Sequence, residues 1–322
     1  MSKLKSIAVA GSILVDKINV ISAYPKEGQL TQISKVSKAV GGCVPNVAID
    51  LKKLCPSLDV YALGLVGNDA DGEYATQTIS SFGVDVTKVK TCKDNTSFTQ
   101  VMSVEGGQRT FFTYAGASAL FGEMDIDFEN LSAKYLHLGY FLLLNKIDNG
   151  DGEKVLKEAK RRGITTSIDL VSENSNRYSL VLPCLKYVDN LIINESEASA
   201  LTGIVPTQEN LVKMAKRLME LGVLQRVILH TPELSVCVSK DGVTSIPSYS
   251  LPQGFIKGTT GAGDAFCAGA LLKIIEEKSD QEILEFASAV AVTALTAQDA
   301  VSGILEQSKV IEFCSNLKRK SI

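Results

Sequence analysis

The chain has 322 residues, of which 45% are hydrophobic and 21% are charged, and its formal net charge is -3 at pH 7. These values are typical of a globular chain that fills one large domain or two ordinary ones. They exclude the clustered basic excess of a nucleic-acid-binding surface. The basic cluster 318–320, at the C-terminus, predicts a solvated tail.

The seven cysteines are widely spaced and form no CxxC pair, and the chain has two histidines, His137 and His230. This pattern predicts neither a disulfide scaffold nor a Cys/His metal site. It is typical of buried thiols in a reducing compartment, so we expect a cytoplasmic protein. The first apolar run is short and is interrupted by Asp16, which predicts a core strand rather than a signal peptide or a membrane span.

Apolar segments of strand length alternate with segments of helical periodicity. The predicted strands are residues 6–11, 60–67, 134–140, 165–170, 190–195 and 226–230. The predicted helices are PNVAIDLKKL, GEYATQTISSFG, GEKVLKEAKRRG and NLVKMAKRLMELG, and the last two end on Gly163 and Gly222. This alternation predicts a mostly parallel sheet covered by helices. In such a sheet, ligands bind beyond the carboxyl ends of the strands.

Two segments, residues 17–37 and 97–114, show period-two alternation instead, and EGGQ at 105–108 predicts a hairpin turn. We expect antiparallel strands here, in a small sheet that forms a lid. Because no linker-like segment separates this lid from the rest, residues 1–322 are predicted to form a single domain. Residues 284–298 predict a helix that packs closely on the one starting near Gly263, where Ala265, Ala268 and Gly269 share a face.

The segment GTTGAGD, residues 258–264, places three glycines and a carboxylate directly before a buried helix. Flexible backbone at a helix N-terminus can direct several N–H groups at one point, where the helix dipole adds positive potential. The result is an anion hole, and Asp264 at its edge can accept a proton from an attacking hydroxyl, as phosphoryl transfer requires. The Walker and dinucleotide patterns both fail, because Asp264 follows Gly263 and Phe266 replaces a required glycine. Taken alone, the motif leaves a glycine-rich helix cap as the alternative.

A second motif, VGGCVPNVAIDL at 40–51, places Gly41 and Gly42 before another helix, with Pro45 and Asn46 in its first turn. The diglycine lets a ligand approach the backbone, and the Asn46 amide can both donate to and accept from a hydroxyl. The two motifs in this order, along essentially the whole chain, resemble the double signature of the ribokinase-like (PfkB) family of carbohydrate kinases. The resemblance implies a three-layer α/β/α domain with a mostly parallel central sheet, a small β-sheet lid and an ATP-dependent sugar kinase.

The resemblance also implies roles for individual residues. Asp264 corresponds to the catalytic base, and the backbone N–H groups of the anion hole would come from Gly261, Ala262 and Gly263. The sugar would be bound by Asp16 in GSILVD, together with Gly41, Gly42 and Asn46. On the lid, Arg109 would reach the substrate, and Phe111 or Tyr114 would cover it. The segment GLVGNDADGEY at 64–74 resembles a further family motif, which we interpret as structural.

For the nucleotide, NESEAS at 194–199 resembles the family's N-x-x-E motif. Asn194 and Glu197 would organise Mg²⁺, with Glu197 acting through water, and an ordinary helix cap is the alternative. The family's T-x-G-x-x-G segment corresponds to LHTPELSVCV, where His230 replaces the threonine and Pro232 and Ser235 replace the two glycines. Thr231 is assigned to the nucleotide, but Pro232 weakens backbone contact with phosphate. Gly258 stands where the family commonly has an aspartate linked to a monovalent-cation site, which puts activation by K⁺ in question.

The resulting hypothesis is a kinase that phosphorylates a hydroxyl, expected to be primary, of a monosaccharide. The lid segment RTFFTYAGAS resembles hexose-type members, so a hexose, a ketohexose or a keto-deoxy sugar acid is favoured. Two alternatives stay open: a nucleoside kinase, in which Phe111, Phe112 and Tyr114 would stack on the base, and a non-catalytic sugar or nucleotide sensor. Lid strands near 30–37 and 98–104 predict pairing into a homodimer, with a monomer as the alternative.

Overall fold

The computed structural model describes residues 6–104, 109–173 and 176–321. Its larger sheet has nine strands in the order β13-β12-β11-β10-β9-β8-β1-β4-β5. The predicted strands are present as β1 (Ile7–Ala10), β4 (Val60–Gly67), β8 (Tyr135–Phe141), β9 (Thr165–Leu170), β10 (Asn190–Asn194) and β11 (Arg226–His230). All of these run parallel, as expected. The prediction missed three strands: β5 (Val89–Cys92), β12 (Leu234–Ser239) and β13 (Gly242–Pro247).

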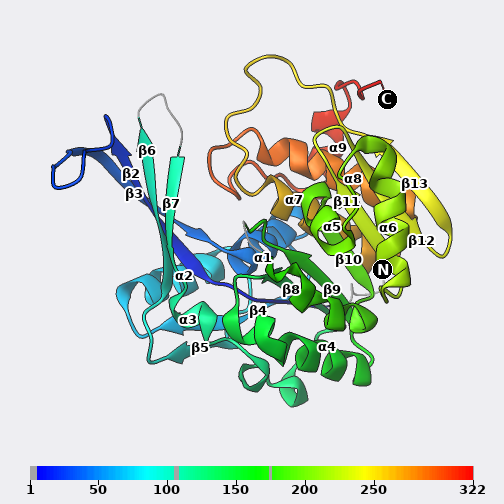
Figure 1. The fold of residues 1–322 in the computed structure, drawn as a ribbon, viewed down its shortest axis with the longest axis horizontal. Coiled ribbons are helices and arrows are strands. Elements are labelled where there is room, and N and C mark those ends of the chain that lie inside the picture. Colours follow the sequence, from blue (N-terminus) through cyan, green and yellow to red (C-terminus); the bar gives the residue numbers. More distant parts are fainter. Residues whose placement is uncertain (1–5, 105–108, 174–175, 322) are drawn as a thin grey trace.

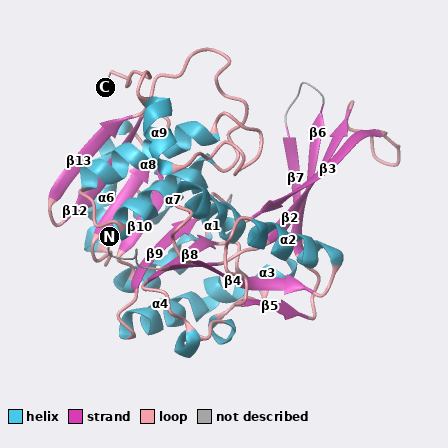
Figure 2. Ribbon diagram, turned by 180° about the vertical axis from the view of Figure 1, so that it is seen from behind, coloured by secondary structure: helices cyan, strands magenta, loops and turns pink. Residues whose placement is uncertain are grey.

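Helices cover both faces of this sheet, which gives three layers (Figures 1 and 2). One face carries α1 (Cys43–Leu54), α2 (Ala70–Ser81), α7 (Ala262–Ile275), α8 (Asp280–Ala294) and α9 (Gln307–Cys314). The other carries α3 (Gly116–Ala119), α4 (Gly152–Arg161), α5 (Glu195–Thr202) and α6 (Leu211–Glu220). The connections include 3₁₀ turns η1 (Glu123–Asp125), η2 (Phe128–Asn130), η4 (Arg177–Tyr187) and η5 (Gln208–Asn210), and a π turn η3 (Ile147–Asp151). Among the described residues, no helix is both long and apolar enough to cross a membrane.

The core follows from strands that are buried on both faces. In β1, Ile7 and Val9 join the hydrophobic cluster on one side of the sheet, and Ala8 and Ala10 join the cluster on the other. This is the arrangement expected of a parallel strand between two helical layers. The sheet therefore holds the carboxyl ends of β8, β9 and β10 in fixed positions beside one another.

Helices α7 and α8 pack closely, as predicted. A side-chain carbon at Gly269 would lie 3.0 Å from the Cα of Ala287, so a larger residue there would crowd this close approach. The predicted position of α8 is wrong by four residues, because the helix covers 280–294 rather than 284–298. Its start is fixed by a capping box in which the Ser279 side chain and Glu282 bond each other's backbone N–H groups.

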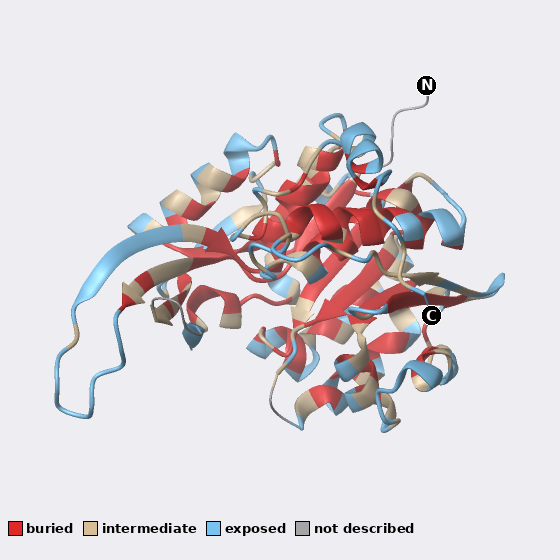
Figure 3. Ribbon diagram, turned by 90° about the horizontal axis from the view of Figure 1, so that it is seen from above, coloured by how far each residue is buried: buried red, intermediate tan, exposed pale blue. Residues whose placement is uncertain are grey.

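The lid is a four-stranded sheet that extends away from the body (Figures 1 and 3). Its strands are β2 (Leu14–Ile21), β3 (Ile33–Gly41), β6 (Ser97–Val104) and β7 (Arg109–Tyr114), in the order β3-β2-β6-β7. The outer pairs are antiparallel, as predicted, but β2 and β6 are parallel, so the prediction is wrong for the central pair. The reason is that β2 follows β1 and β6 follows β5, and β1 and β5 point in the same direction. The predicted turn at 105–108 lies outside the described residues.

The segment 64–74 fixes the base of the lid. This finding supports the interpretation of that segment as a structural motif. The Asp69 side chain caps α2 by accepting from the Gly72 N–H at 2.8 Å. It also accepts from the N–H and the hydroxyl of Thr96, at 2.8 and 2.6 Å. Thr96 directly precedes β6, so Asp69 ties the start of this lid strand to the body.

The basic C-terminal segment is only partly a solvated tail. Lys318 is exposed, but the Arg319 guanidinium donates to the Pro247 carbonyl at 2.7 Å and stacks over the Tyr249 ring at 3.9 Å. The Lys320 ammonium donates to the Pro232 carbonyl at 3.0 Å and to the Glu233 carboxylate at 2.9 Å. The solvated-tail prediction is wrong for these two residues, because nearby carbonyls and an aromatic ring give them fixed partners.

Candidate active site

A cavity of about 200 Å³ lies where the carboxyl ends of β8, β9 and β10 meet the N-terminus of α7. Three carboxylates line it: Asp169 from β9, Glu197 from α5 and Asp264 from α7. Among its lining residues in the described part of the chain there is no lysine or arginine. Three acidic groups, with no lysine or arginine among these lining residues, make this cavity suited to a divalent cation.

Asp264 is the best positioned base in this cavity. One of its carboxylate oxygens accepts from the Asn46 amide at 2.8 Å and from the Tyr140 hydroxyl at 2.9 Å. Burial and, to a smaller extent, the Asp169 charge raise the pKa of Asp264 to about 7, whereas the two hydrogen bonds act in the opposite direction. A carboxylate with a pKa near neutrality can accept a proton in one protonation state and release it in the other.

The glycines before Asp264 form the start of α7. Gly261 is the N-cap residue in the left-handed region (φ 77°), and a side-chain carbon there would lie 2.4 Å from the Ala300 side chain. At Gly263 the corresponding carbon would meet only a His230 ring carbon, at 3.7 Å. Both glycines place first-turn N–H groups beside the cavities, as an anion hole requires. The predicted contribution of Ala262 is not supported, because its N–H donates to the Thr259 carbonyl at 3.3 Å.

Asn194 and Glu197 form a capping box at the start of α5. The Asn194 side chain accepts from the Glu197 N–H at 2.9 Å, and Glu197 accepts from the Asn194 N–H at 3.1 Å. The other Glu197 oxygen accepts from the Ser172 hydroxyl at 2.8 Å. Burial raises the pKa of Glu197 to about 7, with Asp169 adding to the effect. The helix-cap interpretation is therefore correct for this pair, and Glu197 faces the cavity as well.

Two residues of the site were missed by sequence reasoning, Asp169 and Tyr140. The Asp169 carboxylate accepts from the Tyr140 N–H at 2.6 Å, and the Tyr140 hydroxyl reaches Asp264. Tyr140 has a left-handed backbone (φ 59°), which is uncommon outside glycine. The signal was available for Asp169, because a charged residue at the carboxyl end of an apolar strand marks a ligand position in this class of sheet.

The second predicted motif lies against Asp16. Gly42 is the N-cap of α1 (φ 92°), and a side-chain carbon there would lie 2.6 Å from the Ser12 carbonyl. At Gly41 such a carbon would lie 2.6 Å from an Asp16 carboxylate oxygen, so the glycine leaves that carboxylate accessible. Burial raises the pKa of Asp16 to about 6, although a Thr99 hydrogen bond and the Arg109 charge lower it.

The register of the lid places Asp16, Arg109 and Phe111 on one face. Asp16 pairs with Thr99 and Thr99 with Thr113, while Val101 pairs with Phe111 and Ser103 with Arg109. The Arg109 guanidinium donates to the Thr260 hydroxyl at 3.4 Å, so this face is turned toward the anion hole. Tyr114 lies on the opposite face, stacked on Phe98 at 5.2 Å with its hydroxyl donating to Asp94. The expectation that Tyr114 covers the substrate is therefore wrong, because successive strand residues alternate between faces.

A second cavity, of about 670 Å³, adjoins the N-terminus of α7. Its lining includes Thr231, Pro232, Ser235 and Lys320. The Thr231 hydroxyl donates to the Leu234 carbonyl at 2.9 Å and accepts two N–H groups of the same turn, so it is occupied locally. Burial lowers the pKa of His230 to about 4, which keeps that ring neutral against Phe266. The size of this cavity suits a ligand as large as a nucleotide.

The acidic cavity and the larger cavity adjoin each other. The sequence that forms them also matches the model of a known protein family. Residues 4–307 match the model described as pfkB family carbohydrate kinase. The chain belongs to this family. It is therefore a kinase that transfers a phosphoryl group to an alcohol group of a sugar, and the family resemblance drawn from the two motifs is confirmed.

The sequence of this kinase aligns with those of individual relatives over nearly their whole length. The chain is 25% identical to a ribokinase of Haemophilus influenzae, over 96% of this chain and 98% of the relative. It is 24% identical to fructokinase-1 of Oryza sativa, over 94% and 95%. A solved structure of Arabidopsis thaliana ribokinase complexed with ribose and ATP has a TM-score of 0.83 and 25% identity, over 96% and 98%. The predicted three-layer fold with a lid is confirmed.

Proposed function

We propose that this kinase transfers the γ-phosphate of ATP to a primary hydroxyl of a monosaccharide, with Asp264 as the general base. The observation that carries the proposal is the 2.8 Å hydrogen bond from Asn46 to Asp264. It joins the motif beside Asp16 to the carboxylate at the anion hole. A hydroxyl bound between Asn46 and Asp264 would therefore lie next to a phosphate bound at the N-terminus of α7.

The nucleotide is assigned to the larger cavity, with its phosphates at Gly261 and Gly263. Support comes from the cavity's position at this helix N-terminus and from the related structure that contains ATP. Lys320 lines the same cavity, with its ammonium paired to the Glu233 carboxylate. Pro232 lines it too and contributes only a carbonyl, which the Lys320 ammonium already contacts. We therefore expect phosphate binding to depend on α7 rather than on the Pro232 turn.

The acidic cavity fits Mg²⁺, because three carboxylates line it and no lysine or arginine of the described residues does. Glu197 would hold the ion, through water, and Asn194 fixes the Glu197 backbone by the capping box. Bound Mg²⁺ would neutralise the charge of the phosphate oxygens.

In the transfer step, the oxygen of the sugar hydroxyl attacks phosphorus, and the Asp264 carboxylate accepts the proton of that hydroxyl. The Asn46 amide and the Tyr140 hydroxyl hold the carboxylate in place by donating to one oxygen, and the second oxygen is free for the substrate. The backbone N–H groups of Gly261 and Gly263 donate to the phosphate oxygens, where negative charge is greatest. Each task falls to a group that the fold holds rigid.

For the acceptor we favour a hexose, a ketohexose or a keto-deoxy sugar acid. Asp16 would accept hydrogen bonds from the sugar hydroxyls, and Gly41 leaves it accessible. The Arg109 guanidinium lies on the same lid face as Asp16 and would pair with the carboxylate of a sugar acid. The ribokinase relative makes a pentose the closest competitor.

A nucleoside acceptor is the second candidate, and one observation favours it. Phe111 is 60% exposed on the lid face that carries Asp16 and Arg109, so its ring is free to stack on a base. Phe112 and Tyr114 lie on the other face and would not take part. Competition between nucleosides and sugars for the same site separates the two candidates.

The lid also supports a homodimer. Its exposed apolar side chains include Leu30, Ile33, Val36 and Phe112, with exposed fractions of 90%, 43%, 69% and 56%. Strands β3 and β7 are the edges of the lid sheet and can pair with another strand. The expectation that residues 98–104 pair with a second lid is wrong, because they belong to β6, which already has a neighbour on each side. Covering these side chains by a second lid would remove them from water. Sedimentation equilibrium of the full chain tests this, and a monomer at every concentration would refute it.

The deciding experiment measures ADP release with Mg-ATP over a panel of hexoses, pentoses, keto-deoxy acids and nucleosides. One acceptor class should give turnover well above the rest and above the sugar-free rate. Arg109→Met should then raise the KM of a sugar acid much more than that of a neutral sugar. ATP binding without turnover on any acceptor would favour the sensor, and the absence of ATP binding would refute the assignment of the larger cavity.

A further inference from the structure

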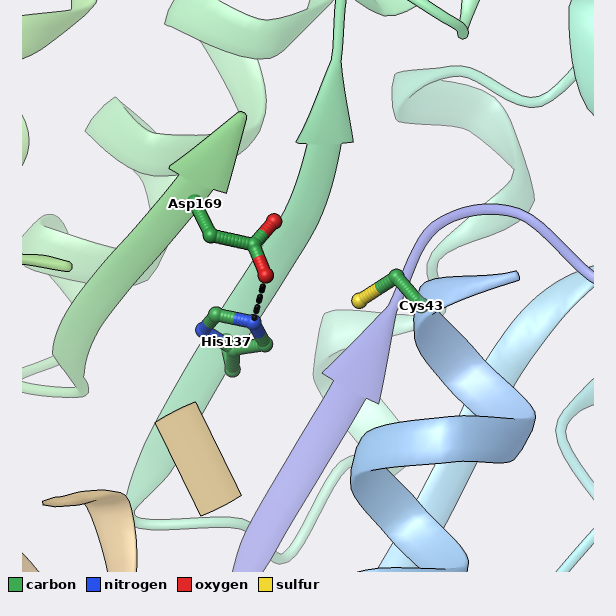
Figure 4. A group of neighbouring side chains, drawn as sticks. All are labelled: Cys43, His137 and Asp169. Carbon is green, nitrogen blue, oxygen red and sulfur yellow. Dashed lines mark ion pairs between the residues drawn. The ribbon is translucent and has the colours of Figure 1, made fainter. Parts of the chain in front are cut away.

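Three metal-ligating side chains from distant parts of the chain meet directly behind the catalytic cavity (Figure 4). Cys43 begins α1, His137 lies on β8 and Asp169 lies on β9. One ligand atom from each lies within 4.8 Å of the other two. Their exposed fractions are 0%, 0% and 7%. The cysteine spacing predicted no Cys/His metal site, and the parallel sheet nevertheless brings these residues together.

The distances suit a tetrahedral ion. His137 Nε2 lies 3.4 Å from Asp169 Oδ2 and 3.7 Å from Cys267 Sγ. Ordinary zinc–ligand bond lengths in a tetrahedron separate N from O by about 3.3 Å and N from S by about 3.6 Å. His137 and Asp169 therefore already lie at the separation that a tetrahedral ion requires, and the Cys43 thiol lies within 4.8 Å of both. Cys267, on α7, lies near His137 but is not part of the group of ligand atoms that lie within 4.8 Å of one another.

The surrounding hydrogen bonds orient these ligands. His137 Nδ1 lies 3.0 Å from the Ser167 hydroxyl, which leaves Nε2 as the atom that faces Asp169. The other Asp169 oxygen, Oδ1, accepts from the Tyr140 N–H at 2.6 Å. Metal-binding histidines usually have a partner of this kind on the second ring nitrogen, which fixes the ring and its tautomer. A buried histidine that merely fills the core has no need of two acidic or thiol neighbours at Nε2.

We propose that Cys43, His137 and Asp169 bind a zinc-class divalent ion, and that this ion inhibits the kinase. One thiol, one imidazole and one carboxylate form a ligand set that zinc prefers over magnesium. On binding, the Cys43 thiol loses its proton to solvent and its sulfur bonds the ion, with no change of oxidation state. Burial raises the pKa of this thiol, so in the metal-free protein it is neutral.

Inhibition follows from the position of the ligands. Of the three ligands, Asp169 also lines the catalytic cavity, together with Asp264. An ion bound to Asp169 would place a positive charge close to Asp264 and make its carboxylate a weaker base. It would also fix Asp169, whose backbone partner Tyr140 orients Asp264. Turnover should therefore fall while the fold stays intact.

The first test is a titration of the purified, metal-free full chain with Co²⁺, followed by absorption spectroscopy. A site with a cysteine ligand gives a thiolate-to-cobalt charge-transfer band, and we expect it to saturate at one ion per chain. Cys43→Ala should abolish the band. Cys184→Ala, which removes a buried thiol elsewhere (3% exposed), should leave it unchanged. No band, or an equal band in Cys43→Ala, would overturn the proposal.

The second test measures Zn²⁺ inhibition with Mg-ATP in excess, each variant being compared with its own metal-free rate. Inhibition of the wild type should be reversed by a zinc-selective chelator. His137→Gln and Cys43→Ala should each raise the half-inhibiting concentration by about 10-fold or more. Equal inhibition of all variants would exclude this site, and a cobalt band without inhibition would refute the inhibitory role. If Cys43→Ala does not fold, His137→Gln serves in both tests. The cobalt spectrum needs no turnover, so it is independent of which sugar is the acceptor.

Discussion

The side-chain amide of Asn46 donates a 2.8 Å hydrogen bond to the carboxylate of Asp264, across a sequence separation of 218 residues. Both partners are buried and both lie in the first turn of a helix, Asn46 in α1 and Asp264 in α7. The two motifs that were separate in the sequence thereby become one site. The following predictions test what each side of this contact contributes.

Asp264→Asn should lower kcat by about 10²-fold or more, because the amide cannot accept the proton of the sugar hydroxyl. Binding of ATP and sugar should change little, since the variant is nearly isosteric and removes one charge. Steady-state kinetics and isothermal titration on the same preparation measure both effects. Turnover close to the wild-type rate would exclude Asp264 as the base.

The pH profile should report the raised pKa of the base. Because the deprotonated carboxylate is the active form, kcat/KM should rise with pH through about 7 and level off above it. The Tyr140 hydroxyl lowers this pKa by donating to Asp264. Tyr140→Phe should therefore shift the acid limb to higher pH. An unchanged limb in Tyr140→Phe would mean that another group controls the profile.

The same carboxylate should destabilise the fold at high pH. Its folded-state pKa of about 7 lies above the ordinary value of 3.8, so the folded state binds more protons than the unfolded state between these values. The free energy of unfolding of the wild type therefore falls as pH rises through this window. In Asp264→Asn the side chain does not ionise, so this decrease in the free energy of unfolding does not occur. The variant should therefore have a higher melting temperature than the wild type at pH 8, and the difference should be smaller at pH 5. The exposed Asp241→Asn is the control, and an equal shift in both variants would contradict the prediction.

Two glycine variants separate backbone strain from occlusion of the anion hole. Gly261→Ala places its new carbon 2.4 Å from the Ala300 side chain at a left-handed φ, so it should lower both the melting temperature and kcat. Gly263→Ala meets only a His230 atom at 3.7 Å, so the melting temperature should be retained. Its methyl group faces the phosphate site and should raise the KM for ATP. The reverse pattern, a stable Gly261→Ala and an unstable Gly263→Ala, would refute this description of the helix start.

Asp16→Ala should raise the KM for the sugar far more than the KM for ATP, because its carboxylate lies beside Gly41 and away from the larger cavity. Asn19→Ala is the matched control, since Asn19 is on the same strand and bonds Gln100 within the lid. This control should change both constants little. Equal increases in the two KM values for Asp16→Ala would remove Asp16 from the sugar site.

Much of the central sheet and both motifs followed from the sequence. Strands 60–67 and 226–230 were predicted to the residue, because largely apolar runs between helical patterns identify parallel strands that are buried on both faces. The chemistry of Asp264 and its glycines followed from local backbone physics at a helix N-terminus. These features depend on short stretches of chain, so the sequence determines them.

Other features depend on which distant segments the sheet brings together. Only the strand order places Asp169 and His137 beside Cys43, and only the lid register turns Phe111 toward the site and Tyr114 away from it. The contacts of Arg319 and Lys320 likewise depend on carbonyls of β13 and the Pro232 turn. A local pattern determines the chemical types of such residues, whereas their distances are set by long-range strand pairing. The sequence by itself therefore determined the kinase motifs, and the tertiary structure decided which acidic, thiol and aromatic groups surround them.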